Sequence, residues 1–223
     1  MKQHQSLSSS GMANPGATVT ICDLHCRFGS SQVVSGANLD ILPGEHVAIV
    51  GGNGSGKTTL LRAVIGLHRQ WSGHIAINGE KQNQAPAAAH PLVAWMPQRQ
   101  PRGQFPYTVK ELLGSSHSVE AAHCWAEQLG IVHLLSHNLS TLSGGQLQRS
   151  FLARALGSLA DGAGLLLADE PTAALDFQGQ EQVADMLAQL PNTMLVVTHD
   201  LSLAQKCHRV LHMAQGVLRQ ARI

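Results

Sequence analysis

The sequence predicts an α/β fold in which a mainly parallel β-sheet is joined to a small α-helical subdomain. Three short, wholly apolar runs are typical of parallel strands that are covered on both faces. They are residues 47–50, 165–168 and 194–197. A glycine-rich loop joins the first run to a helical pattern that begins at Thr59. Between Thr108 and His137 the apolar spacing shifts toward 3.6 residues, which indicates helices.

Length and composition indicate one large domain. A chain of 223 residues has room for a single domain with a subdomain, at roughly 150 residues per domain. It carries 15 basic and 14 acidic residues, so no strong overall field attracts nucleic acid, and we expect no nucleic-acid partner. Residues 1–17 are polar and aperiodic and predict a flexible tail, which leaves residues 18–223 as the domain.

The apolar runs and the cysteines indicate where in the cell the chain is expected to be. No run reaches the 18 apolar residues of a membrane span, and the N-terminus lacks the apolar centre of a signal peptide. Four sparse cysteines indicate reduced thiols, so we expect a cytosolic chain. Cys22, His25 and Cys26 are close enough to suggest metal ligands. They lie in a strand-like segment without a second ligand pair, and a structural metal site is not favoured.

Alternation, helical spacing and turn residues place the elements along the chain. In the first half we expect strands at 18–28, 33–41 and 47–50, a helix at 59–67, a turn at 71–73, a hairpin strand at 74–79 and a strand at 92–96. In the second half we expect helices at 109–113, 119–129, 143–156 and 178–190 and strands at 165–168, 194–197 and 209–213.

Residues 51–58 have the pattern of a phosphate cradle. They are Gly51, Gly52, Asn53, Gly54, Ser55, Gly56, Lys57 and Thr58. Glycines let successive backbone N–H groups close around an anion, and the helix that follows adds about half a positive charge at its N-terminus. Lys57 adds a full positive charge, and Thr58 offers a hydroxyl to the Mg²⁺ that accompanies the phosphates. The alternative is a loop that only turns a strand into a helix.

Asp169 and Glu170 follow the apolar run at 165–168, where a buried strand is expected to end. In an open parallel sheet, ligands bind at the carboxyl ends of the strands, so this pair should face the phosphates. One carboxylate, assigned here to Asp169, can help to bind Mg²⁺. Glu170 can then polarise the water that attacks a γ-phosphate, as general base. The alternative is two solvated acids in a loop.

A second anion site is expected where Ser143, Gly144 and Gly145 open a long helix. With Leu142 and Gln146 these residues read Leu-Ser-Gly-Gly-Gln, and here the sequence resembles the ATP-binding-cassette (ABC) ATPases. The resemblance covers essentially the whole chain from residue 18 onward. It implies a P-loop NTPase core with a mainly parallel sheet, an N-terminal antiparallel β subdomain and a helical subdomain at about residues 99–155.

The resemblance also implies how the site is assembled. Two copies of the chain would pair head to tail, and each ATP with its Mg²⁺ would lie between the cradle of one copy and residues 143–145 of the other. Thr59 and Gln146 would join the residues that hold the nucleotide.

Four further positions match the family. Phe28 matches an aromatic ring that stacks on adenine, although a core phenylalanine is the alternative. Gln98 matches a glutamine that reaches Mg²⁺ and the attacking water, and His199 matches a histidine that senses the γ-phosphate. Asp176 matches a loop that crosses the dimer interface, where Ala173 replaces a frequent serine. The catalytic residues implied are Glu170, His199, Gln98 and Lys57, and those near Mg²⁺ are Thr58, Gln98 and Asp169.

In the transporter branch of this family, the ATPase lies on the cytoplasmic face of the membrane and drives a separate integral permease, with an extracytoplasmic substrate-binding protein in the complex. The segment after Gln98 contains Phe-Pro-Tyr-Thr-Val at 105–109, which resembles the zinc and manganese importers. An importer of a siderophore, haem or another small solute is the alternative. A soluble ABC ATPase is less favoured, since the chain has one cassette and no heptads. A P-loop kinase would leave residues 143–146 and His199 unexplained.

Overall fold

The computed structural model describes residues 16–82, 93–98, 107–160 and 162–221. The tail expected at 1–17 therefore lies outside the described residues except for Gly16 and Ala17. Ala17 is fully buried, and its N–H donates to the Gly164 carbonyl at 3.1 Å. The fold thus already includes Ala17. The expected start of the helical subdomain near residue 99 also lies outside the described residues.

The N-terminal region forms a four-stranded antiparallel sheet in the order β2-β1-β4-β5. Its strands are β1 (Val19–Phe28), β2 (Ser31–Ile41), β4 (Trp71–Ile77) and β5 (Glu80–Lys81). The turn expected at 71–73 is wrong, because Trp71 pairs with Cys26 and begins β4. Gly73, at φ 107°, lies where a Cβ would collide with the backbone of Asp23, at a register shift between β1 and β4. This glycine therefore marks a bulge rather than a turn.

The second sheet has six strands in the order β10-β9-β3-β8-β7-β6. These are β3 (His46–Val50), β6 (Val93–Met96), β7 (Leu165–Asp169), β8 (Thr193–Val197), β9 (Arg209–Ala214) and β10 (Val217–Gln220). All neighbours pair in parallel except β10, which pairs antiparallel to β9 at the edge. The mainly parallel core is thus confirmed, whereas β10 was not expected.

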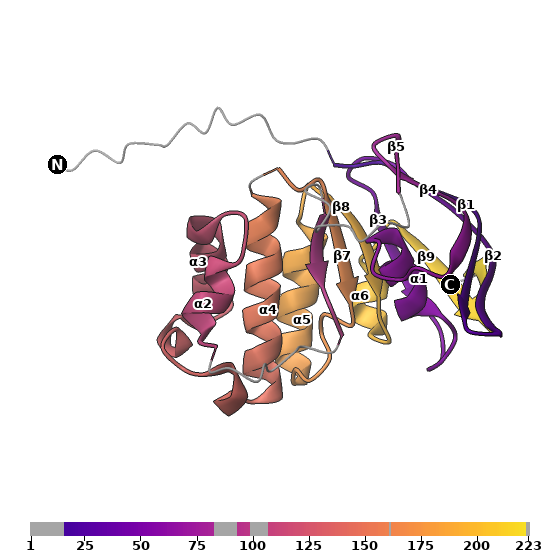
Figure 1. Cartoon of the computed structure of the whole chain (residues 1–223). Helices are drawn as coiled ribbons and strands as arrows, with labels where there is room; N and C mark the ends of the chain where they lie inside the picture. Colours follow the sequence, from indigo (N-terminus) through magenta and orange to yellow (C-terminus); the bar gives the residue numbers. More distant parts are fainter. Residues whose placement is uncertain (1–15, 83–92, 99–106, 161, 222–223) are drawn as a thin grey trace.

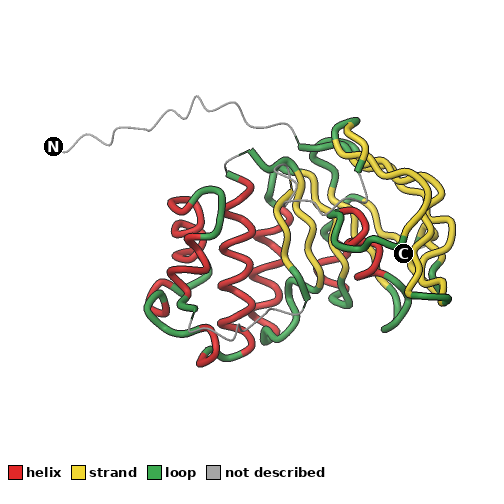
Figure 2. The backbone as a smooth tube through the Cα atoms, viewed as in Figure 1, coloured by secondary structure: helices red, strands yellow, loops and turns green. Residues whose placement is uncertain are grey.

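Six α-helices are present in the described residues. They are α1 (Lys57–Val64), α2 (Val109–Gly114), α3 (Val119–Gln128), α4 (Gly144–Leu159), α5 (Phe177–Ala188) and α6 (Leu201–Gln205). Figure 1 shows α2 and α3 beside α4 on the left, and the antiparallel strands on the far right. The tube in Figure 2 shows the same separation of helices from strands. The short helix α6 was not expected.

The parallel strands separate two hydrophobic cores. Ala48, Leu166 and Val196 face the core that includes α4 and α5, whereas their neighbours Ile49 and Leu167 face the core that includes α1 and the antiparallel sheet. Successive side chains of a strand point to opposite faces, so a strand between two cores is apolar throughout. This explains the uninterrupted apolar runs in the sequence. It also leaves the strand ends as the places where polar groups reach a cavity.

We predict that Gly157→Ala destabilises the fold. A Cβ at Gly157, on α4, would lie 2.5 Å from the Cβ of Ala122 on α3, so the two helices would have to separate. Alanine normally stabilises a helix interior by about 1 kcal/mol relative to glycine, but overpacking costs about 1–3 kcal/mol and should exceed that gain. The free energy of unfolding in urea measures the net effect. Gly114→Ala is the control, because a Cβ there meets nothing within 4 Å. Equal stability of the two variants would contradict the prediction.

Candidate active site

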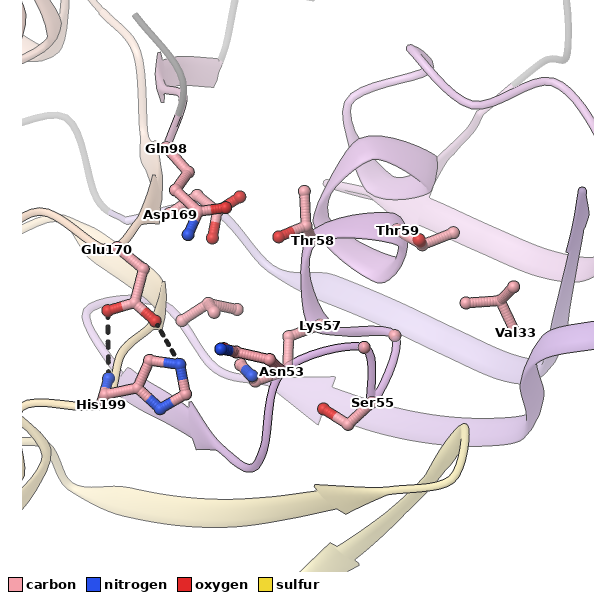
Figure 3. A pocket seen from close by; sticks show the side chains of 13 residues that line it. Val33, Asn53, Ser55, Lys57, Thr58, Thr59, Gln98, Asp169, Glu170 and His199 are labelled. Carbon is pink, nitrogen blue, oxygen red and sulfur yellow. Dashed lines mark hydrogen bonds and ion pairs between the residues drawn. The ribbon is translucent and has the colours of Figure 1, made fainter.

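A cavity of about 310 Å³ lies at the carboxyl ends of β3, β7 and β8 (Figure 3). It collects most of the predicted site from segments far apart in the sequence. Its lining is Val33, Asn53, Gly54, Ser55, Gly56, Lys57, Thr58, Thr59, Gln98, Asp169, Glu170, Val197 and His199. The cradle, both carboxylates, the glutamine and the histidine therefore share one cavity. Val33 and Val197 were not predicted, although Val197 ends the apolar run that precedes His199.

The cradle is a tight loop in which geometry requires glycine at two positions, Gly51 and Gly56. Gly56 caps α1 at φ 106°, and a Cβ there would lie 2.6 Å from the Val33 carbonyl. At Gly51 a Cβ would collide with the Met213 carbonyl. Lys57 begins the helix and donates from Nζ to the carbonyls of Gly51 at 2.6 Å and Gly52 at 2.9 Å. The ammonium group is thus held within the loop, where a phosphate can replace the carbonyls as its partner.

Asp169 is 1% exposed, and neither of its carboxylate oxygens has a hydrogen-bond partner within the described residues. Burial raises the pKa of Asp169, against the opposing influence of the Thr58 hydroxyl, Arg62 and Lys57. A buried carboxylate without donors is costly, and a hard cation with oxygen ligands would satisfy it. Thr58 and Gln98 point into the same part of the cavity in Figure 3. The oxygens of these three side chains therefore fit Mg²⁺.

Glu170 is held by His199. The His199 backbone N–H donates to Glu170 Oε2 at 3.1 Å, and His199 Nε2 lies 3.2 Å from Oε1 (dashed in Figure 3). Burial raises the pKa of Glu170, and His199 opposes that increase. Glu170 also has a φ of 55°, in the left-handed region that non-glycine residues rarely adopt. Such strain is common at functional sites.

A second cavity of about 460 Å³ contains the other predicted anion site. Ser143, Gly144, Gly145 and Gln146 line it together with Asp176, and it shares no lining residue with the first cavity. Ser143 Oγ accepts from the Gln146 N–H, and Gln146 Oε1 accepts from the Ser143 N–H, so a capping box begins α4. Asp176 caps α5 by accepting from the Gly179 N–H at 2.9 Å. A single chain thus keeps its two anion sites apart.

Phe28 lies outside both cavities. Its side chain is 53% exposed, and its ring centroid is 4.7 Å from that of His68. The alternative of a core phenylalanine is therefore wrong, and the ring is free to contact a ligand.

The described residues include no group of three His, Cys, Asp or Glu that could hold a metal ion. Cys26 is buried, which raises its pKa to about 12, whereas Cys22 is exposed.

Known proteins resemble this chain over most of its length. The family model described as ABC transporter matches residues 34–173. The lipoprotein-releasing system ATP-binding protein LolD of Pseudomonas fluorescens is 35% identical, over 85% of this chain and 89% of LolD. The zinc import ATP-binding protein ZnuC of Jannaschia sp. is 34% identical, over 82% of this chain and 73% of ZnuC. The dimeric ATP-binding cassette MJ0796, bound to ADP and Pi after hydrolysis, superposes with a TM-score of 0.77 at 25% identity, over 92% of this chain and 99% of that one.

We predict that Asp169→Asn reduces the gain in ATP affinity that Mg²⁺ provides. The amide carries no charge to bind the cation, while the cradle that holds the phosphates is unchanged. ATP titrations with Mg²⁺ and with a chelator should therefore converge. Lys57→Met should instead weaken ATP binding about 10- to 100-fold under both conditions, because it removes a charge-assisted hydrogen bond.

Asp185→Asn is the matched control for this experiment. Asp185 pairs with Lys206 at 2.9 Å on the surface, outside both cavities, so its substitution should leave both titrations unchanged. A full Mg²⁺ effect in Asp169→Asn would refute the assignment of Asp169.

Proposed function

The chain belongs to the ABC transporter ATPases, and from this premise we propose that it is the ATP-hydrolysing subunit of a transporter whose permease is a separate membrane protein. ATP and Mg²⁺ are the cofactors of this family. The observation that carries the proposal is the single cavity in which the cradle meets Asp169, Glu170 and His199. No helix in the described part of the chain is long and apolar enough to cross a membrane. From the family we propose that the subunit lies at the cytoplasmic face of the membrane, bound to its permease.

We propose that the working unit is a head-to-tail homodimer. The two anion sites of one chain line separate cavities, so residues 143–145 do not contribute to the cavity that contains Lys57. A second copy can bring its own residues 143–145 to that cavity. The dimeric state of the similar cassette MJ0796 supports this arrangement. We call residues 143–146 the signature. Asp176, beside the signature in the second cavity, would then lie at the interface.

The proposed roles follow from the contacts. Lys57 and the cradle N–H groups would bind the phosphates. Thr58, Gln98 and Asp169 would hold Mg²⁺, which when bound would supply positive charge beside the phosphate oxygens. Glu170 accepts a proton from the attacking water, and burial raises its pKa toward the range where it is an effective base. His199, whose Nε2 lies 3.2 Å from Glu170 Oε1, orients that carboxylate and, as its match to the family implies, senses the γ-phosphate. Phe28 would stack on the adenine.

We predict that Glu170→Gln lowers kcat by about 10²- to 10⁴-fold, the usual contribution of a general base. The amide cannot accept the proton, but the cradle is intact, so ATP should still bind and hold the dimer closed. Phosphate release and gel filtration with ATP and Mg²⁺ measure the two effects. Glu181→Gln, on the exposed face of α5, is the control and should match the unsubstituted chain. Normal turnover of Glu170→Gln would show that another group is the base.

For the transported substrate we propose a transition metal, zinc or manganese, delivered to the permease by an extracytoplasmic binding protein. The segment Phe-Pro-Tyr-Thr-Val at 105–109 favours this choice, although residues 105 and 106 lie outside the described residues. Similarity to the zinc import protein ZnuC supports it. Release of lipoproteins is the second candidate, because LolD proteins from several bacteria are similar to this chain. The identities of 34% and 35% do not separate the two.

Deletion of the gene should distinguish these substrates. If the chain powers metal import, the deletion strain should contain less cell-associated zinc or manganese when the metal is scarce, and plasmid-borne Glu170→Gln should not restore it. Elemental analysis of washed cells measures this, and the unsubstituted gene is the positive control. Unchanged zinc and manganese, together with lipoproteins left unreleased from the membrane, would instead favour the LolD-like function.

A further inference from the structure

Gln148 is a buried polar residue that contacts the proposed general base. It lies on α4, is 3% exposed, and donates from Nε2 to the backbone carbonyl of Glu170 at 2.7 Å. The two residues are 22 positions apart in the sequence, so the bond joins the signature helix to the end of β7. A hydrogen bond this short between buried groups fixes the orientation of both.

The backbone of Glu170 needs to be held. A residue with a side chain at a φ of 55° is strained and persists only where its surroundings enforce it. The Glu170 N–H donates to the Val197 carbonyl at 2.8 Å, and the Glu170 carbonyl accepts from the Ala173 N–H at 3.1 Å. These backbone bonds come from the neighbouring strand and from the turn that follows Glu170. Gln148 adds an anchor from the opposite side, through a helix.

The direction of the Glu170 carboxylate depends on these anchors. Its carbonyl carbon and its side chain are bonded to the same Cα, so a displacement of that Cα, or relaxation of its strained φ, moves the carboxylate as well. The carboxylate now lies 3.1 Å from the His199 N–H, inside the cavity. The Glu170 carbonyl accepts from two donors, Gln148 Nε2 at 2.7 Å and the Ala173 N–H at 3.1 Å. If the Gln148 bond were lost, only the longer bond from Ala173 would remain of the two.

We propose that Gln148 is a positioning residue for Glu170: through the carbonyl of Glu170 it fixes the backbone from which the base reaches the attacking water. The proposal rests on the proposed ATPase function. Gln148 lines neither the cavity that contains Lys57 nor the cavity that contains residues 143–146, so it is not expected to bind ATP itself. Its effect should therefore fall on kcat, and the KM for ATP should change little.

The test measures steady-state ATP hydrolysis by the full-length chain with Gln148→Met, which keeps the side-chain volume and removes the N–H donor. We expect kcat to fall about 10- to 100-fold, as for a misplacement of about 1 Å, with KM within about twofold. Gln148→Leu is the second variant. It also removes the amide donor without adding a charge, and it should show the same loss if the methionine variant folds poorly.

Gln82→Met is the matched control. Gln82 is 7% exposed, and its Nε2 donates to the Val64 carbonyl at 2.9 Å, at the end of α1 that is remote from the cradle. Like Gln148→Met, this control loses a buried hydrogen bond from a side-chain amide to a backbone carbonyl. Its melting temperature should fall as that of Gln148→Met does, but its kcat should stay within about twofold of the unsubstituted chain. An equal loss of kcat in both variants would show a general structural effect and overturn the proposal.

A double-mutant cycle separates action through Glu170 from action elsewhere. In a Glu170→Gln background, adding Gln148→Met should not lower the single-turnover rate further, because the base that Gln148 positions is already absent. A further 10-fold loss in that background would overturn the proposal. An unsubstituted chain that hydrolyses no ATP would overturn the proposed function and this role with it. Normal hydrolysis by both Gln148 variants would overturn this role alone.

Discussion

The structure depends on one electrostatic constraint, which is that two adjacent carboxylates are buried at the end of a strand between two hydrophobic cores. Asp169 and Glu170 are 1% and 6% exposed. An ionised carboxylate in such surroundings costs several kcal/mol unless positive charge or N–H donors compensate it. Lys57 and His199 provide part of that compensation for Glu170. Lys57, Arg62 and the Thr58 hydroxyl provide part of it for Asp169, but no described group donates a hydrogen bond to the Asp169 oxygens. The site is therefore arranged to receive a cation together with an anionic ligand.

The strand order makes this arrangement possible. β8 lies between β3 and β7 in the sheet, so the cradle after β3 and the carboxylates after β7 are separated by one strand, and His199 follows that strand. All of these strands run in parallel, so the loops that follow them lie at one edge. The side chains of the strands fill the two hydrophobic cores. The side chains that could bind ligands therefore belong to residues at or just beyond the strand ends. The signature residues begin α4 and line a separate cavity.

The sequence alone predicts a feature correctly where that feature is a short local run of residues or has a known spacing. The cradle, the carboxylates after β7 and the first turn of α4 were all predicted, because each is a short run with its own chemistry. Features that depend on tertiary contacts were not. Gly73 was taken for a turn because nothing local reveals that β1 bulges toward it at Asp23. Gln148 was missed for a similar reason, although a polar residue on the buried face of a helix is a detectable signal.

The path of α4 suggests how the signature residues are linked to the base, which follows β7 and accepts a hydrogen bond from α4. Gly145 and Gln148 are less than one helical turn apart, so the first turn of α4 cannot move without moving the amide that holds the Glu170 carbonyl. In the proposed dimer, Ser143 and Gly145 contact the nucleotide of the other copy. Binding at one site would then be transmitted through α4 to the base of the other site. Arg154, further along α4, donates to the Trp95 carbonyl at 2.6 Å, three residues before Gln98. The same helix therefore contacts the backbone of Glu170 and the backbone near Gln98. A displacement of α4 would then move the Glu170 and Gln98 side chains together.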